Sequence, residues 1–156
     1  MNGRFFLLTI GMTLLTMTGS STPTESETRP RGQNVLDQAT LKQAQTGQVD
    51  FKSHIKPILE TKCAPCHNQE ALPDRMSLAN HREALRSGTL RGFIIPGQPD
   101  VSPLLTRLQS AHTNVQAMPP VGESLTPDEV SLIKRWIRQG AYWPSGADGN
   151  LKTLAR

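Results

Sequence analysis

Apolar side chains recur at helical spacing in several separate stretches, and no stretch alternates between apolar and polar residues as a strand would. The clearest helix begins after Thr126, which is a capping residue followed by Pro127, a residue favoured at the first helical position. Glu129 completes a capping box with Thr126. Gly140 is expected to end this helix, whose apolar face is predicted to hold Val130, Ile133, Trp136 and Ile137. The pattern predicts an all-α fold: a small helical domain with long loops.

A second helix is expected just before the two cysteines, where four apolar residues fall at helical spacing: Phe51, Ile55, Ile58 and Leu59. Pro57 interrupts this pattern because it lacks an N–H and crowds the preceding turn. Either the helix kinks at Pro57, or it begins with Ser53 as N-cap and accepts Pro57 in its first turn. Weaker patterns predict short helices over 35–45, 80–87 and 102–110, and a loop over the Gly- and Pro-rich stretch 88–103.

The N-terminal residues have the pattern of a secretory signal. Arg4 precedes an apolar run over residues 5–17, and small residues follow it. This run is too short for an ordinary transmembrane helix, and the alternative is a signal that stays uncleaved as a membrane anchor. We therefore expect an exported, periplasmic protein. The predicted organisation is a signal peptide over 1–20, a disordered polar linker over 21–48, a folded domain over 49–144 and a C-terminal tail over 145–156.

The chain contains few aromatic and hydrophobic residues for a protein that must form a core from its side chains alone. Aromatic residues make up 4% and hydrophobic residues 36% of the 156 residues, so a large apolar cofactor would add buried surface that the side chains lack. The formal net charge is +4, but the chain has no long basic run and no interleaving of aromatic and basic residues. Nucleic-acid binding is therefore not indicated.

Both cysteines of the chain lie in one unit, Cys63-Ala64-Pro65-Cys66-His67. This spacing is typical of c-type haem attachment, in which the two thiols add to the haem vinyl groups and the histidine coordinates the iron. A structural disulfide, a thioredoxin-like redox pair and a zinc site are the alternatives. A disulfide leaves His67 unexplained, the redox pair lacks its alternating strand–helix pattern, and zinc lacks a second cysteine pair. We therefore expect one covalently bound haem c.

The second axial ligand of the iron must come from elsewhere in the chain. Outside the signal, the methionines are Met76 and Met118. Met118 is the preferred ligand because two prolines follow it and would stiffen a loop that holds its thioether over the haem. Met76 is expected to pack, and His112 is the chief competitor. Other candidates are expected to be solvent-facing helix residues (His54 and His81), a core residue (Trp136), or surface residues that could pair with haem propionates (Arg91 and Arg107).

Further matches to a known family are spread over residues 49–144. They are Val49-Asp50-Phe51, Ile55 to Leu59, Lys62 to His67, Ile95-Pro96-Gly97, Ser102 to Leu105, Met118-Pro119-Pro120, Leu125-Thr126, Trp136-Ile137, Gln139-Gly140-Ala141 and Trp143-Pro144. The segment resembles the planctomycete-type cytochrome c domain, a branch of the class I cytochromes c. The resemblance implies a helical cytochrome c fold with thioethers at Cys63 and Cys66 and with His67 and Met118 as axial ligands. Two departures are Leu72 to Met76, where the family has a glycine-rich segment, and Ser87-Gly88, where it has a glycine pair.

The expected function is electron transfer between redox partner proteins that bind transiently, with no catalytic residue. One alternative is a haem enzyme, peroxidase-like or reactive towards small gases, with an open or labile sixth position. Its candidate catalytic groups by sequence are His112 and Arg107. The other alternative is a docking module of a larger complex, in which the haem mainly stabilises the fold.

Overall fold

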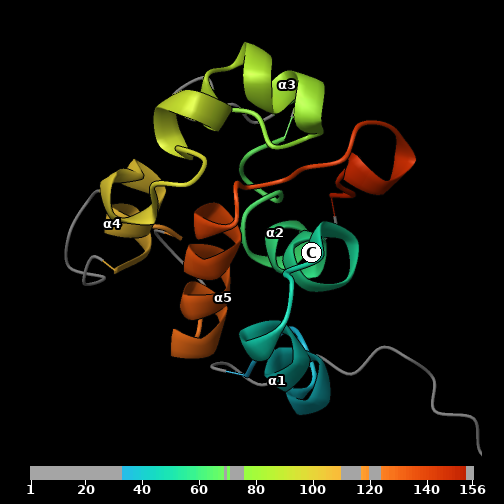
Figure 1. Cartoon of the computed structure of the whole chain (residues 1–156). Coiled ribbons are helices and arrows are strands. Elements are labelled where there is room, and N and C mark those ends of the chain that lie inside the picture. Colours follow the sequence, from blue (N-terminus) through green and yellow to red (C-terminus); the bar gives the residue numbers. More distant parts are fainter. Residues whose placement is uncertain (1–32, 69, 71–75, 110–116, 120–123, 154–156) are drawn as a thin grey trace, which may run out of the picture.

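Helix α5 (Pro127–Arg138) runs between α4 (Pro103–Gln109) on one side and α1 (Gln38–Thr46) and α2 (Lys56–Lys62) on the other (Figure 1). The computed structural model describes residues 33–68, 70, 76–109, 117–119 and 124–153. Within these residues the chain forms helices and loops and no strand, so the all-α prediction is confirmed. None of the helices in this part of the chain is long and apolar enough to cross a membrane.

The capping box of α5 forms as predicted. Thr126 Oγ1 accepts a hydrogen bond from Glu129 N at 3.2 Å, and Glu129 Oε2 accepts one from Thr126 N at 2.9 Å. The helix ends before Gly140, whose φ of +101° favours glycine. Ile133, Trp136 and Ile137 are buried as predicted, whereas Val130 is only half-buried. Leu132 and Glu129 are buried in addition, although they were not predicted on this face.

The helix before the cysteines begins differently from either predicted form. Asp50, not Ser53, is the N-cap: Asp50 Oδ1 accepts a hydrogen bond from Ser53 N at 2.8 Å. Bonds from the Ser53 hydroxyl and N–H lower the pKa of Asp50. A π-helical turn, η1 (Phe51–Ile55), then leads into α2, whose first turn contains Pro57. Because Pro57 offers no N–H to the preceding turn, the α-helical bonding pattern does not extend back through η1.

The short helix predicted over 35–45 is present as α1, and it lies inside the segment 21–48 that was expected to be a disordered linker. Its Leu41 and Ala44 are buried, and α1 packs against α5. Val35 N donates to Glu129 Oε1 at 2.6 Å, and Arg135 Nη2 donates to Gly47 O at 2.8 Å. The packed part of the described chain therefore includes residues from 34 onwards, ahead of the predicted boundary of 49.

The predicted short helices over 80–87 and 102–110 are present as α3 (His81–Arg86) and α4. The stretch between them, predicted as a loop, contains two short turns, η3 (Thr89–Phe93) and η4 (Pro99–Val101). Gly88 precedes η3 with a φ of +78°, which suits a residue without a Cβ. These turns carry the chain from α3 to α4.

The core is one cluster that includes three aromatic rings. Phe51 stacks on Trp143 with ring centroids 4.8 Å apart, and Trp136 lies 6.0 Å from Phe51. The predicted C-terminal tail also packs on this core. It forms the turn η5 (Ala147–Gly149), and Trp143 Nε1 donates to Gly149 O at 2.8 Å. The folded part therefore extends beyond the predicted boundary at 144.

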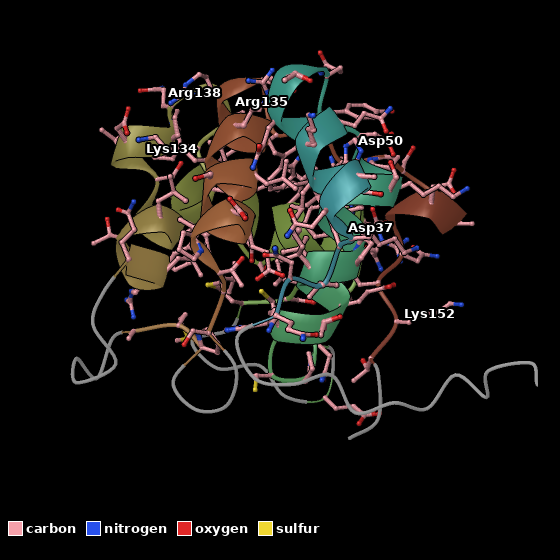
Figure 2. The ribbon with its side chains drawn as sticks, turned by 90° about the horizontal axis from the view of Figure 1, so that it is seen from below. Asp37, Asp50, Lys134, Arg135, Arg138 and Lys152 are labelled. Carbon is pink, nitrogen blue, oxygen red and sulfur yellow. The ribbon has the colours of Figure 1, made fainter. Side chains whose placement is uncertain are left out.

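Basic side chains gather at the C-terminal end of α5, where Lys134, Arg135 and Arg138 are labelled in Figure 2. Lys134 Nζ lies 2.6 Å from Asp100 Oδ1, which ties α5 to η4. Cations at a helix C-terminus also interact favourably with the helix dipole. This cluster therefore has a structural explanation.

Candidate cofactor site

The Cys-x-x-Cys-His unit continues the end of α2 as a further turn. Cys63 N donates to Leu59 O at 3.0 Å, and His67 N donates to Cys63 O at 2.9 Å. Side chains three and four residues apart on such a turn share one face. Cys63, Cys66 and His67 therefore point to the same side of the chain, and all three line one cavity.

This cavity is walled mainly by apolar side chains from α2, η3, α4 and α5. It encloses about 760 Å³ of space free of protein atoms, its open mouth included. The apolar lining residues are Leu59, Leu78, Phe93, Ile94, Leu104, Leu108, Pro119 and Ile133, and Lys62, Thr89 and Arg107 add polar groups. A concave site with a mainly apolar lining and a few polar groups is typical of ligand and cofactor pockets.

Both methionines outside the signal reach this cavity. Met118, which was predicted as an axial ligand, lines it, and Met118 N donates to Arg107 O on α4 at 3.0 Å. Met76, which was expected to pack, packs at the cavity wall itself. It lies two residues before Leu78, whose N–H donates to His67 O at 2.9 Å. Met76 thus belongs to the side of the cavity that carries His67, whereas Met118 belongs to the side of α4.

The two cysteines are free thiols in different surroundings. Cys66 is exposed, whereas Cys63 faces the apolar cavity and is half-buried. Burial, and to a smaller extent the neighbouring Cys66 and Glu129, together raise the pKa of Cys63 to about 12, against the opposing effect of Lys62. Lys62 itself is buried, and its Nζ donates to Ser124 O at 3.4 Å. Cys63 therefore remains a neutral thiol at neutral pH.

His54, His81 and Trp136, which were also considered from the sequence, differ in how exposed they are. His54 was expected to face solvent, and this is wrong: it is buried, and its Nδ1 accepts a hydrogen bond from Asp50 N at 2.9 Å. His81 is half-buried at the start of α3. Trp136 is a core residue, as predicted. His112 lies outside the described residues.

The two arginines predicted as surface residues differ from each other. Arg91 is exposed on η3. Arg107 is half-buried at the cavity, with its Cζ 5.8 Å from the centroid of the Phe93 ring. This is a cation–π contact, which holds the guanidinium beside the lining. Of these two arginines, Arg107 is therefore the one that lines the cavity.

Sequence reasoning did not find Thr89, Phe93 or Met76 as cavity residues, since none lies in a recognisable motif.

Among the described residues, no group of three or more His, Cys, Asp and Glu side chains is placed to hold a metal ion. Comparisons with protein-family models, with curated proteins and with solved structures find no match for this chain.

Proposed function

We propose that this chain is an exported mono-haem c-type cytochrome that transfers electrons between redox partner proteins. One haem would be bound through thioethers at Cys63 and Cys66, with His67 and Met118 as axial ligands to the iron. The observation that carries the proposal is that Met118, which is distant in sequence from the Cys-x-x-Cys-His unit, lines the same apolar cavity as Cys63, Cys66 and His67. The resemblance to the planctomycete-type cytochrome c domain supports the same interpretation.

The chemistry of the lining fits a haem group. Two thiols and an imidazole lie on one turn, thioether sulfurs lie on other segments, and the remaining wall is mainly apolar. Thiolate, imidazole and thioether groups are the protein ligands and attachment points that haem proteins use. Arg107 would be the partner for the haem carboxylates, because it is the arginine at the cavity.

Met118 is the better candidate than Met76 for the sixth ligand position. Met76 is tied through Leu78 to the carbonyl of His67, the proposed ligand on the other face. Met118 is tied to α4, which lies across α5 from α2 (Figure 1). We therefore expect Met118, rather than Met76, to supply the second ligand to the iron.

The chain's own residues would set the properties of such a site. When bound, the haem iron would supply a one-electron redox couple. The apolar wall formed by Leu59, Ile94 and Ile133 would shield part of a bound haem from water, and burial and a methionine ligand both raise a haem potential. Filling both axial positions leaves no place for a substrate at the metal.

The test is an optical spectrum of the protein expressed with a c-type haem maturation system, together with a haem stain after denaturation. We expect covalent haem, sharp low-spin reduced bands and a weak sulfur-to-iron band in the oxidised form. Met118→Leu should abolish the sulfur-to-iron band. Met76→Leu is the matched control, since it makes the same chemical change in the same cavity, and it should retain the band.

Several outcomes would contradict the proposal. Absence of covalent haem from the wild-type protein would sink it entirely. Loss of the sulfur-to-iron band in Met76→Leu, and not in Met118→Leu, would assign the ligand to Met76. Rapid spectral change of the wild-type protein on adding carbon monoxide or hydrogen peroxide would indicate an open sixth position and a haem enzyme instead.

A further inference from the structure

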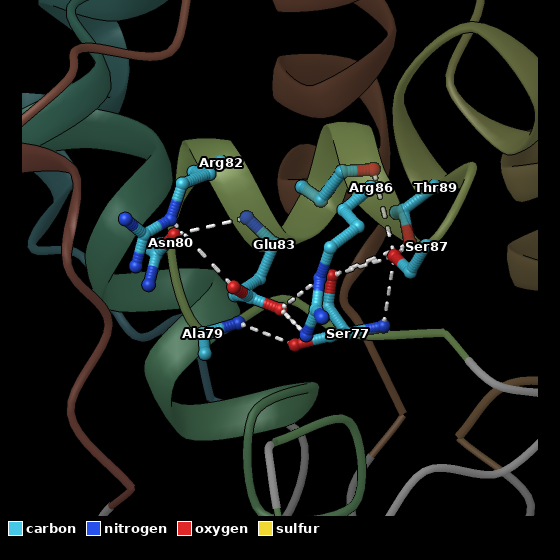
Figure 3. A network of polar contacts seen from close by, with 9 residues as sticks. Ser77, Ala79, Asn80, Arg82, Glu83, Arg86, Ser87 and Thr89 are labelled. Carbon is cyan, nitrogen blue, oxygen red and sulfur yellow. Dashed lines mark hydrogen bonds and ion pairs between the residues drawn. The ribbon is translucent and has the colours of Figure 1, made fainter.

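Three hydroxyl-bearing residues meet behind the cavity wall, next to the end of α3 (Figure 3). Ser77 N donates to Ser87 Oγ at 3.2 Å, and Thr89 Oγ1 donates to Ser77 O at 3.3 Å. Ser87 Oγ and Thr89 Oγ1 are themselves 2.9 Å apart. Ser77 is 3% exposed and Thr89 is 0% exposed. The hydroxyls of Ser87 and Thr89 thus satisfy the backbone N–H and C=O of Ser77, which is shielded from water.

Ser77 is the middle residue of a short strap, defined here as residues 76–78, that borders the cavity. Its neighbours Met76 and Leu78 both line the cavity, as does Thr89. Leu78 N donates to His67 O at 2.9 Å. The strap is therefore bonded at its end to His67 and at its middle to the hydroxyls of Ser87 and Thr89.

We infer that Ser87 and Thr89 are positioning residues for His67, acting through the strap. Residues behind a metal ligand fix its orientation and tune the metal that it binds. Ser87→Ala leaves Ser77 N without its acceptor, and Thr89→Val removes the shorter of the two hydroxyl bonds to Ser77 O, where Ser87 Oγ at 3.5 Å remains. Each change weakens the hold on a buried backbone group and favours opening of the strap. The inference rests on the proposed function, because His67 is there the iron ligand. Neither hydroxyl touches the iron in this role.

The test compares Thr89→Val and Ser87→Ala with a matched control, Ser102→Ala. Ser102 is also a buried serine, 1% exposed, and its hydroxyl lies 2.9 Å from both Ile95 N and Gln98 O, away from the strap. The first measurement is hydrogen exchange of the Leu78 amide in the protein as isolated. We expect exchange about three- to tenfold faster in Thr89→Val and Ser87→Ala, as one lost hydrogen bond produces, and no change in Ser102→Ala.

The second measurement is the reduction potential and low-spin spectrum of the haem-loaded protein. The potential and the spectrum should shift in Thr89→Val and Ser87→Ala and should stay at the wild-type values in Ser102→Ala. Ser87→Ala provides the same test if Thr89→Val does not fold. Unchanged exchange and potential in the strap variants, or equal shifts in Ser102→Ala, would overturn the inference. If the wild-type protein carries no haem, the proposed function fails, while Leu78 exchange still decides whether the hydroxyls hold the strap to His67.

Discussion

Cys63 and Cys66 are neighbours in the chain, but their thiols differ in exposure. Cys66 is exposed, whereas Cys63 faces the apolar cavity, where burial raises its pKa to about 12. The thiolate is the reactive form of cysteine, so a raised pKa lowers reactivity at every pH below it. The fold therefore gives different exposure and different reactivity to two cysteines that look equivalent in the sequence.

In protein prepared without haem, we expect iodoacetamide at pH 8 to alkylate Cys66 at least about tenfold faster than Cys63. With a pKa of about 12, only about 10⁻⁴ of Cys63 is thiolate at this pH, and burial slows access further. Fragmentation of the tryptic peptide that holds both cysteines distinguishes the two products. In concentrated guanidinium chloride the two rates should converge. Equal rates in dilute buffer would show that the cavity does not form without the cofactor.

Residues of the candidate site were predictable where their chemistry is adjacent in sequence. Cys63, Cys66 and His67 form one recognisable unit, and their convergence follows from one turn of backbone bonds. Thr89 and Met76 carry no such signal, because they reach the cavity only in the folded chain, where Thr89 bonds to the strap that contains Met76. His54 was expected on the surface because histidine is usually at least partly exposed, and its bond to Asp50 N explains its burial.

Among the α-helices, α5 was strongly predicted from its sequence, whereas α1 was predicted only weakly. The capping box at Thr126 and Glu129 is a local rule, so the start of α5 could be read directly. Helix α1 buries only Leu41 and Ala44, too few apolar residues to give a clear period. The segment that leads into α1 is attached to the start of α5. There Glu129 accepts a hydrogen bond from Val35 N, and Thr126 Oγ1 donates one to Asn34 Oδ1. One capping box thus holds two segments of the chain.

We expect Thr126→Ala to lower the free energy of unfolding by about 1 kcal/mol, the usual cost of losing a helix cap. Glu129→Ala should cost more, roughly 2–3 kcal/mol, because it leaves Val35 N and Thr126 N without their acceptor. Urea unfolding curves measure both. Ser131→Ala, at an exposed position of the same helix, should change the free energy by less than about 0.5 kcal/mol. Equal losses in the Thr126 and Glu129 variants would mean that the link to Val35 contributes nothing.

At the scale of the whole molecule, the C-terminal segment of the described chain lies against α2, the helix that leads into the cysteines, and the N-terminal segment packs on α5. Lys152 N donates to Glu60 Oε1 on α2 at 2.8 Å, and Leu151 N donates to Ala79 O at 2.8 Å. Composition predicted a linker and a tail here, because these segments contain few apolar residues. They are held largely by backbone and polar bonds, which leave no hydrophobic period in a sequence.

Gly149 is the point at which the closing C-terminal segment tolerates no side chain. A Cβ at this position would lie 1.8 Å from Pro144 O and 3.1 Å from Trp143 Cδ1. Gly149→Ala must therefore displace η5 and weaken the bond from Trp143 Nε1, which stacks on Phe51 at the start of η1. We expect a loss of roughly 1–3 kcal/mol in thermal or urea unfolding, as for other overpacked sites. Gly92→Ala is the matched control, since a Cβ there meets nothing within 4 Å, and its unfolding midpoint should equal or slightly exceed that of the wild type. If both variants unfold at the same midpoint, the C-terminal segment does not support the helix that leads to Cys63.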